Sequence, residues 1–551
     1  MPPKGNEMLK GMGKSKAKAQ DPQTENEFLD AADDFEQAAG KWRAGDAAKA
    51  TRFFNRAIDM YNEGLKKFPG SFDLAYNKAN LEFNICEDDR IVARFSSKMA
   101  LLEETLKSHR VAMALKAENT DVMFNTGQVL TSIAEALLEA ETEETAKVPA
   151  RTLLEEAVDL FTKCLERQQQ EYEQMRIEIA KAQAEQDLED QLGAGQGLAS
   201  GAKKYDEMET SSTASSTLGN WATVEEPLTP ETILETCTAQ LEALTTLLGL
   251  YDPTDLLLEA RAQHGVDTTN KVPTLITLLD DSPFQKHAEA PSGPTLSISP
   301  SGTIAEDLQT APKDDALLAV ANFNVAVAEV AYRRGLSTSD QFARAMSDIF
   351  TPMTKPPGGQ DPAYLNALSA YADALMDVAS TISDNPSHNA NSPAYAADLE
   401  TQWAVLTEAQ NILTKLSTGA NASALPASRL ADTFLARGDT DLFRFRLALL
   451  PVAKPPWASS KATLVGNAGV FYRGARSYAE KAGKADVHRT ADAKAIVAEV
   501  LKEVVSSGGG IIVGNESWKV KGMEVKKVLE QMVEEGILGR DEAEGVLRIV
   551  Q

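Results

Sequence analysis

The sequence predicts an all-α fold, a solenoid of helical hairpins with low-complexity insertions and a small α/β cap at the C-terminal end. Two observations lead to this class. A small–large–small order of residues recurs at helical spacing, and stretches of alternating apolar and polar residues, typical of strands, are rare. Residues i, i+4 and i+7 share one face of a helix, so each copy of the order needs neighbouring helices to bury it. The two clear copies and one weaker copy are Ala50, Phe54, Ala57; Ala157, Phe161, Cys164; and Thr105, His109, Ala112.

Helices that alternate with these stripes also match one another. The stretches 75–83 and 123–130 align so that Ala79 and Gly127 take the same small position. With these features residues 27–185 resemble the tetratricopeptide repeat (TPR) family, in which helix–turn–helix units of about 34 residues stack into a solenoid. The resemblance implies that Ala79 and Gly127 lie in the first helix of a unit, that the stripes lie in the second, and that Pro69 closes a unit. A bundle of amphipathic helices with chance similarity is the alternative.

The chain of 551 residues is too long for one ordinary core, and its composition shifts mark seven segments. The stretch TSSTASST, residues 210–217, is typical of a flexible linker, and Thr229, Pro230 and Glu231 are typical of a helix start. The predicted segments are 1–26, a disordered basic tail; 27–190, TPR-like repeats; 191–228, a flexible linker; 229–280, a helical segment; 281–312, a second low-complexity linker; 313–485, degenerate helical repeats; and 486–551, the C-terminal cap.

The first twenty residues carry five lysines opposed only by Glu7. A solubilising tail is the favoured interpretation; a nuclear import signal or contact with RNA on a larger particle are the alternatives. No apolar segment typical of a signal peptide is present in these residues, and we expect no membrane span in the chain.

In the second half, the stretch 430–439 ends in Gly438–Asp439, a pair that matches the predicted turn at Gly45–Asp46. The last segment changes character, because a glycine run at 506–514 is followed by a predicted short strand at 517–520. We interpret the glycine run as a hairpin or capping loop rather than a phosphate site, since no Lys or Thr follows at the required offset. A cap would cover the apolar face that the last repeat of a solenoid exposes.

The net charge of −26 bears on the partners of this chain. Such a surface repels nucleic acid and acidic membranes, so we expect no direct nucleic-acid binding by the repeats and no membrane binding. It suits a basic protein partner such as a ribosomal protein or a histone. The three cysteines are far apart, which fits a reducing compartment; we expect a cytoplasmic location, with the nucleus left open.

Residue types that support catalysis do not converge in the sequence. The five histidines are scattered, no Cys or His pair has metal-ligand spacing, and no nucleophile or dinucleotide motif occurs. We therefore expect no enzyme, no cofactor and no metal site.

A protein-binding surface is the better hypothesis, because stacked helix pairs present their first helices on a concave face. The TPR resemblance implies which side chains face that groove, and asparagine amides there suit an extended peptide backbone. Packing between helices is the alternative role for the aromatic members. The implied binding residues are Phe35, Trp42, Tyr76, Asn77, Asn80, Phe83, Phe124, Asn125 and Gln128.

These features predict an adaptor or assembly chaperone that holds partner proteins on a helical-repeat surface. A constitutive scaffold subunit of a stable multiprotein complex is the alternative. The sequence leaves the oligomeric state open.

Overall fold

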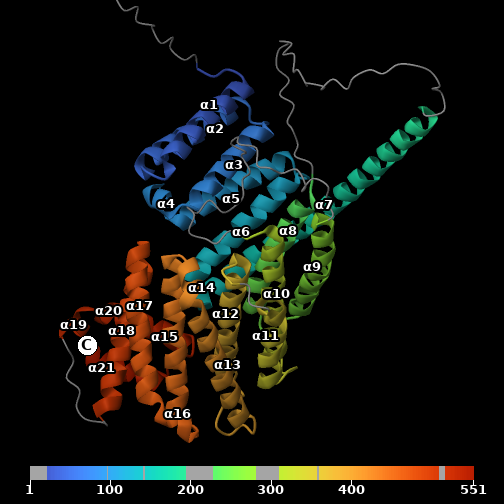
Figure 1. The fold of residues 1–551 in the computed structure, drawn as a ribbon. Helices are drawn as coiled ribbons and strands as arrows, with labels where there is room; N and C mark the ends of the chain where they lie inside the picture. Colours follow the sequence, from blue (N-terminus) through green and yellow to red (C-terminus); the bar gives the residue numbers. More distant parts are fainter. Residues whose placement is uncertain are drawn as a thin grey trace, which may run out of the picture. The chain divides into compact units, whose positions relative to one another are not determined.

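The computed structural model describes residues 21–95, 97–140, 143–193, 228–280, 310–355, 359–507 and 516–551, which form twenty-one helices and no strand (Figure 1). The chain divides into two compact units, unit 1 up to Ala136 and unit 2 from Leu137 onward, and the boundary falls within one helix. Each unit is described by itself below. The all-α class predicted from the sequence is confirmed.

Unit 1 consists of helices that pack in sequence order, α1 with α2 and α3 with α5, with the short α4 between them. Several starts follow from side-chain caps: Thr24 forms a capping box with Glu27, and Asp46, Ser71 and Ser97 each accept a backbone N–H of the following turn. The helices are α1 (Glu25–Arg43), α2 (Ala47–Lys67), α3 (Phe72–Cys86), α4 (Asp89–Phe95), α5 (Lys98–Leu115) and α6 (Thr120–Ala140), the last of which runs into unit 2.

The small–large–small stripes of unit 1 lie in its core. Ala50 and Ala57 are fully buried on α2 and Phe54 between them is 5% exposed, while Thr105, His109 and Ala112 of α5 are all buried. His109 therefore takes a core position, as the pattern predicts. A ring at this position fills the space that the two small residues open between helices.

Unit 2 is an array in which each long helix packs against the next one or two along the chain, which is a helical-repeat architecture. Figure 1 shows α10, α12, α15 and α17 next to one another. Its helices are α7 (Glu143–Gly193), α8 (Pro230–Leu250), α9 (Leu257–Asp280), α10 (Pro312–Arg333), α11 (Ser339–Thr354), α12 (Pro362–Asp384), α13 (Tyr395–Leu416), α14 (Gly419–Ala424), α15 (Ala427–Leu449), α16 (Pro455–Ser459), α17 (Lys461–Ala482), α18 (Ala485–Ser507), α19 (Glu516–Val520), α20 (Gly522–Glu534) and α21 (Arg540–Val550).

Helix α7 has two distinct halves. Its first half buries Ala157, Phe161 and Cys164, as the stripe predicts, and packs on α8. Further along, Ile177 and Ile179 are 60% and 46% exposed, and the ribbon extends beyond its neighbours (Figure 1). The prediction that this charged extension is solvated is confirmed for the side chains that the structure describes.

The strand predicted at 517–520 is wrong, because these residues belong to helix α19. A single short strand without a partner leaves its backbone N–H and C=O groups unsatisfied, whereas a helical turn pairs them locally. Trp518 is the residue that the segment buries, at 9% exposed. The described part of the C-terminal segment is therefore helical rather than α/β, and residues 508–514 of the glycine run lie outside the described residues.

The predicted likeness between Gly438–Asp439 and the Gly45–Asp46 turn is also wrong, because α15 continues through both residues. A Cβ atom at Gly438 would lie 2.3 Å from Tyr472 Cε1, so glycine allows the tyrosine ring of α17 to pack directly on the α15 backbone. Asp439 then accepts the Tyr472 hydroxyl at 2.8 Å and pairs with Lys494 Nζ at the same distance. Gly438 and Asp439 therefore join α15 to neighbouring helices and do not form a turn.

Helix α10 is long and apolar enough to cross a membrane by length and composition, the one such helix in the part of the chain that the structure describes. No membrane span is expected from the sequence, and that expectation stays a prediction. Its contacts with α8, α9, α11 and α12, and the fully buried Phe323, are those of a core helix in a helical array.

The predicted segment boundaries stay predictions. The tail at 1–20 and most of the two linkers, residues 194–227 and 281–309, lie outside the described residues.

Candidate functional site

The two predicted binding residues of α1 lie against cations of α2. Lys49 Nζ is 3.2 Å from the centre of the Trp42 ring, and Arg56 Cζ is 4.8 Å from that of Phe35. Phe35 is half-buried and Trp42 is 41% exposed. One face of each ring is therefore used within the hairpin, and these two residues offer a partner less surface than the TPR resemblance implies.

Three of the predicted residues come together where α3 meets α6. Asn125 Nδ2 donates to the Tyr76 hydroxyl at 3.1 Å and to Asn80 Oδ1 at 2.9 Å. All three side chains are half-buried. This Tyr76–Asn80–Asn125 cluster connects the first helices of two neighbouring predicted repeats, so the predicted site residues are neighbours in space.

Both the ring and the hydroxyl of Tyr76 have a neighbour that holds them. Its ring stacks on Phe72, with centres 5.5 Å apart and planes 8° apart. Burial, as the largest cause, raises the pKa of Tyr76 to about 12, with Asp121 adding to the rise. The hydroxyl therefore stays protonated at every physiological pH and keeps a proton to donate.

Asn77 and Gln128 lie one turn from the cluster on α3 and α6. In the part of the chain that the structure describes, neither side chain has a hydrogen-bond partner; Asn77 is exposed and Gln128 half-buried. Residues three apart share a helix face, so Asn77 with Asn80 and Asn125 with Gln128 form one polar surface, called the amide face below.

The two remaining aromatic residues of the predicted set are also half-buried. Phe83 meets the His109 ring edge-on, with centres 6.4 Å apart, and so helps to close the α3–α5 interface. Phe124 lies on α6 beside Asn125. Packing between helices, the alternative role for the aromatic residues, is what the structure shows for Phe83.

The amide face has the chemistry to hold an extended backbone. A carboxamide offers two N–H donors and one carbonyl acceptor, which matches the alternating groups of a peptide. The cluster fixes Asn80 and Asn125 in position, while Asn77 and Gln128 keep their full capacity. Side chains that are already fixed lose less conformational entropy when a ligand binds. The cluster would therefore lower the entropy cost of binding, in addition to offering its donors and acceptors.

Where α3 meets α5 lies a buried polar group that the sequence pattern did not single out. Glu82 is 3% exposed, pairs with Lys78 at 3.3 Å, and Lys78 Nζ also donates to Ser108 at 3.1 Å. Burial raises the pKa of Glu82 above its ordinary value, although Lys78 opposes the rise. Its i, i+4 spacing from Lys78 is the signal that could have located the pair.

His109 is fully buried, and neither ring nitrogen has a hydrogen-bond partner among the described residues. Burial lowers the pKa of His109 to about 4, so the ring is neutral at physiological pH. No group of three His, Cys, Asp or Glu side chains in the described ranges could hold a metal ion.

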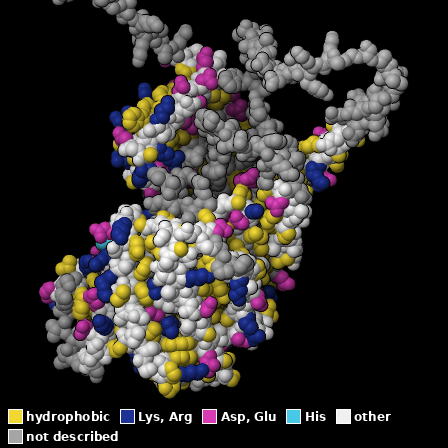
Figure 2. Space-filling model, viewed as in Figure 1, with side chains coloured by type: hydrophobic (Ala, Val, Ile, Leu, Met, Phe, Trp, Pro, Cys, Tyr) yellow, Lys and Arg dark blue, Asp and Glu magenta, His cyan; other side chains and the backbone are white. Residues whose placement is uncertain are grey.

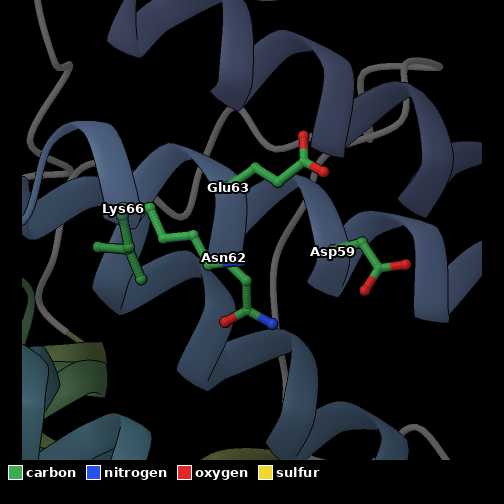
Figure 3. A pocket seen from close by; sticks show the side chains of 5 residues that line it. Asp59, Asn62, Glu63 and Lys66 are labelled. Atoms are coloured by element: carbon green, nitrogen blue, oxygen red, sulfur yellow. The ribbon is translucent and has the colours of Figure 1, made fainter.

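A shallow surface hollow on α2 differs from the amide face because one helix alone lines it. Figure 3 shows Asp59, Asn62, Glu63 and Lys66 along its wall, and all of its described lining comes from this one helix. Side chains of a single helix face cannot converge on a ligand. Over unit 2, charged side chains of both signs are scattered among apolar ones (Figure 2).

Comparison with known proteins gives limited information. No family model matches the chain. The UPF0656 protein C926.02 of Schizosaccharomyces pombe is 30% identical over 141 residues, which cover 26% of this chain and 31% of the relative's length. A solved circular tandem repeat protein with novel repeat topology and enhanced subunit contact surfaces is 13% identical and covers 95% of this chain and 99% of its own. Its TM-score of 0.29 is too low to carry an argument.

Proposed function

We propose that this chain is a protein-binding adaptor or assembly chaperone of the TPR type and that the amide face of unit 1 holds its partner. The observation that carries the proposal is the Tyr76–Asn80–Asn125 cluster, which orders two amides beside the free side chains of Asn77 and Gln128. A stack of helical hairpins accounts for how residues 45 or more positions apart are brought into one hydrogen-bonded surface.

A basic, extended segment is the partner chemistry that we propose. The amides bind its backbone, and the net charge of −26 attracts it from a distance. Binding without catalysis or a cofactor, and a cytoplasmic or nuclear location, remain the expectations from the sequence.

The test starts with affinity capture by the full chain, and mass spectrometry identifies the captured partner. The affinity of the purified partner is then measured at increasing salt concentration. We expect a partner rich in Lys and Arg, with an affinity that falls as salt rises, because salt screens the long-range attraction. A partner that binds equally well at low and high salt would contradict the basic class.

The alternative is a constitutive subunit of a stable complex. Size-exclusion chromatography of the endogenous protein separates the two roles: an adaptor elutes partly as free chain, whereas a constitutive subunit elutes only with its complex. Complete co-elution would favour the scaffold.

A further inference from the structure

The N-terminal tail, residues 1–20, joins unit 1 beside the start of α3, the helix that carries two of the four side chains of the amide face. Just before α1, the Pro22 carbonyl accepts Lys67 Nζ at 2.9 Å. In the first turn of α1, Glu25 Oε1 accepts the hydroxyl of Ser71, which is the buried N-cap of α3. These contacts fix the point at which the tail meets the described structure.

The tail is long enough to lie over the amide face. Asn77 and Asn80 lie six and nine residues beyond Ser71, a rise of about 9 and 14 Å along α3. An extended chain spans about 3.3–3.6 Å per residue, so the eight residues from Lys14 to Pro22 span about 26–29 Å. The last part of the tail therefore suffices to reach the whole of this face on α3.

Two exposed carboxylates continue the amide face toward the start of its helices. Asp73 lies four residues before Asn77 on α3. Asp121 lies four residues before Asn125 on α6. Residues four apart share a helix face, so each acid belongs to the same surface as an amide.

The first turns of α3 and α6 are neighbours. Ala75 of α3 and Val122 of α6 belong to one buried cluster. One turn farther along α6, Asn125 is hydrogen-bonded to Tyr76 and Asn80. The two helices therefore run in the same direction, and the turns that carry the two acids meet beside the point where the tail joins.

The charge of this end of the helices is negative. Two cations lie there: Lys67 Nζ binds the Pro22 carbonyl, and Lys116 Nζ lies 5.2 Å from the centre of the Phe72 ring. Acids are more numerous, because the first turns of α1, α3 and α6 contribute Glu25, Glu27, Asp73 and Asp121. Such an end attracts a basic segment.

The sequence of the tail is complementary to this surface. Lys14, Lys16 and Lys18 alternate with Ser15 and Ala17. In an extended conformation alternate side chains point to the same side, about 6.7 Å apart. Three ammonium groups can then face the acids together, and the small side chains between them leave the backbone accessible.

We propose that the N-terminal tail occupies the amide face in the free chain as an intramolecular ligand. Its lysines pair with Asp73 and Asp121, and the residues before them cover Asn77 and Gln128. This inference rests on the proposed function, because the tail has the chemistry proposed for the partner, a basic extended segment.

Occupation by the tail would regulate access to the face. A tethered segment is present at an effective concentration of about millimolar, because its linker keeps it near the site. A basic segment of another protein must displace it, so only a partner of sufficient affinity binds. The tail would in this way prevent weak contacts with unrelated basic proteins.

A labelled peptide with the sequence of residues 4–20 tests the tail without any partner. Fluorescence anisotropy at low salt compares its affinity for the full wild-type chain and for the full-length triple variant Lys14→Ser/Lys16→Ser/Lys18→Ser. We expect the triple variant to bind the peptide about tenfold more tightly or better, because the peptide no longer competes with a tethered copy. Equal affinity for the two chains, or binding to neither, would overturn the proposal.

Further changes in the triple variant locate the site. Asp73→Asn/Asp121→Asn removes the two proposed partners of the lysines and should weaken peptide binding by about threefold or more. Asp59→Asn removes an exposed carboxylate of α2 and is the matched control, which should bind the peptide like the triple variant. Unchanged binding after loss of both acids would overturn the proposed site.

The tail proposal and the proposed function fail in different experiments. The peptide assay contains no partner, so its failure removes the tail as the occupant and leaves partner binding by the amide face standing. If the tail binds but the captured partner has equal affinity for the wild type and the triple variant, the partner binds elsewhere and the proposed function fails.

Discussion

Units 1 and 2 both stack helices in sequence order and both bury apolar side chains between them, but the α3–α6 contact of unit 1 differs from the continuous core of unit 2. In unit 1 the meeting of α3 and α6 includes half-buried amides and a phenol, hydrogen-bonded at 2.9 to 3.1 Å. In unit 2 one hydrophobic core continues from Ala321 on α10 to Val550 on α21. An apolar core uses all of its surface for packing, whereas a polar contact leaves donors and acceptors for a partner. This difference is the reason why the binding surface is proposed on unit 1.

The largest expected effect comes from removing the phenylalanine of a small–large–small stripe in each unit. It tests whether the stripe is part of the core in both units. Phe54→Ala in unit 1 and Phe161→Ala in unit 2 should each lower the free energy of unfolding by about 3–5 kcal/mol, because the rings are 5% and 1% exposed. Chemical denaturation followed by circular dichroism measures both. Val111→Ala, at a position 51% exposed, is the control and should change stability by less than about 0.5 kcal/mol. A neutral result for either phenylalanine would mean that its stripe does not carry the core.

A second prediction concerns close helix contacts in unit 2. Gly438→Ala should destabilise by about 1–3 kcal/mol, because the new methyl would lie 2.3 Å from the Tyr472 ring. Gly466→Ala on α17 is the matched control, since no atom lies within 4 Å of the place that its new methyl group would take, and alanine favours a helix by about 0.5–1 kcal/mol. Equal denaturation midpoints for the two variants would contradict the close approach.

Removing a side chain of the Tyr76–Asn80–Asn125 cluster in unit 1 should lower stability by a smaller amount. Asn125→Ala removes two hydrogen bonds and should cost about 1–3 kcal/mol of unfolding free energy, at about 0.5–1.5 kcal/mol each. Asn77→Ala, at an exposed side chain, should be nearly neutral. If Asn77→Ala destabilises as much as Asn125→Ala, then Asn77 is a structural residue and the amide face is smaller than described.

A further expected effect is a pH dependence in unit 1. Burial, opposed by the Tyr61 hydroxyl that donates to Glu36 Oε1 at 2.6 Å, raises the pKa of Glu36 to about 7. Because that pKa is raised on folding, the stabilisation is complete below about pH 4.5 and is lost as the pH rises through about 7. Glu36→Gln keeps an acceptor for Tyr61 and should flatten this part of a stability–pH curve. An unchanged curve would show that Glu36 titrates normally.

Local periodicity determines the part of the fold that is predictable from the sequence. The stripes around Phe54 and Phe161 are buried because spacing alone places them on one helix face. The strand prediction at 517–520 fails because a short apolar run is ambiguous between helix and strand. The turn prediction at Gly438 fails because the local sequence does not distinguish two kinds of glycine. One kind ends a helix, and the other lies within a helix and leaves room for the ring of a neighbouring helix.

The residues of the amide face can be chosen from the sequence, but the contacts between them cannot. Asn80 and Asn125 stand out as amides on first helices, yet their hydrogen bond depends on how α3 and α6 are aligned along their axes. The packing of Phe35 and Trp42 against Arg56 and Lys49 was open to prediction, because both aromatic residues follow Phe28 at seven-residue spacing. Side chains two turns apart lie on one face, here the face toward α2.

The proposed binding of a partner by the amide face of unit 1 is tested most directly by the affinity of the captured partner for the Asn77→Ala/Gln128→Ala variant, measured by titration calorimetry. Neither side chain has a hydrogen-bond partner within the described part of the chain, so we expect the double variant to fold like the wild type. Loss of two hydrogen bonds to the partner, at about 0.5–1.5 kcal/mol each, should weaken binding by about fivefold to more than a hundredfold. Asn62→Ala on α2 is the control and should bind like the wild type. A folded double variant with wild-type affinity would contradict the claim.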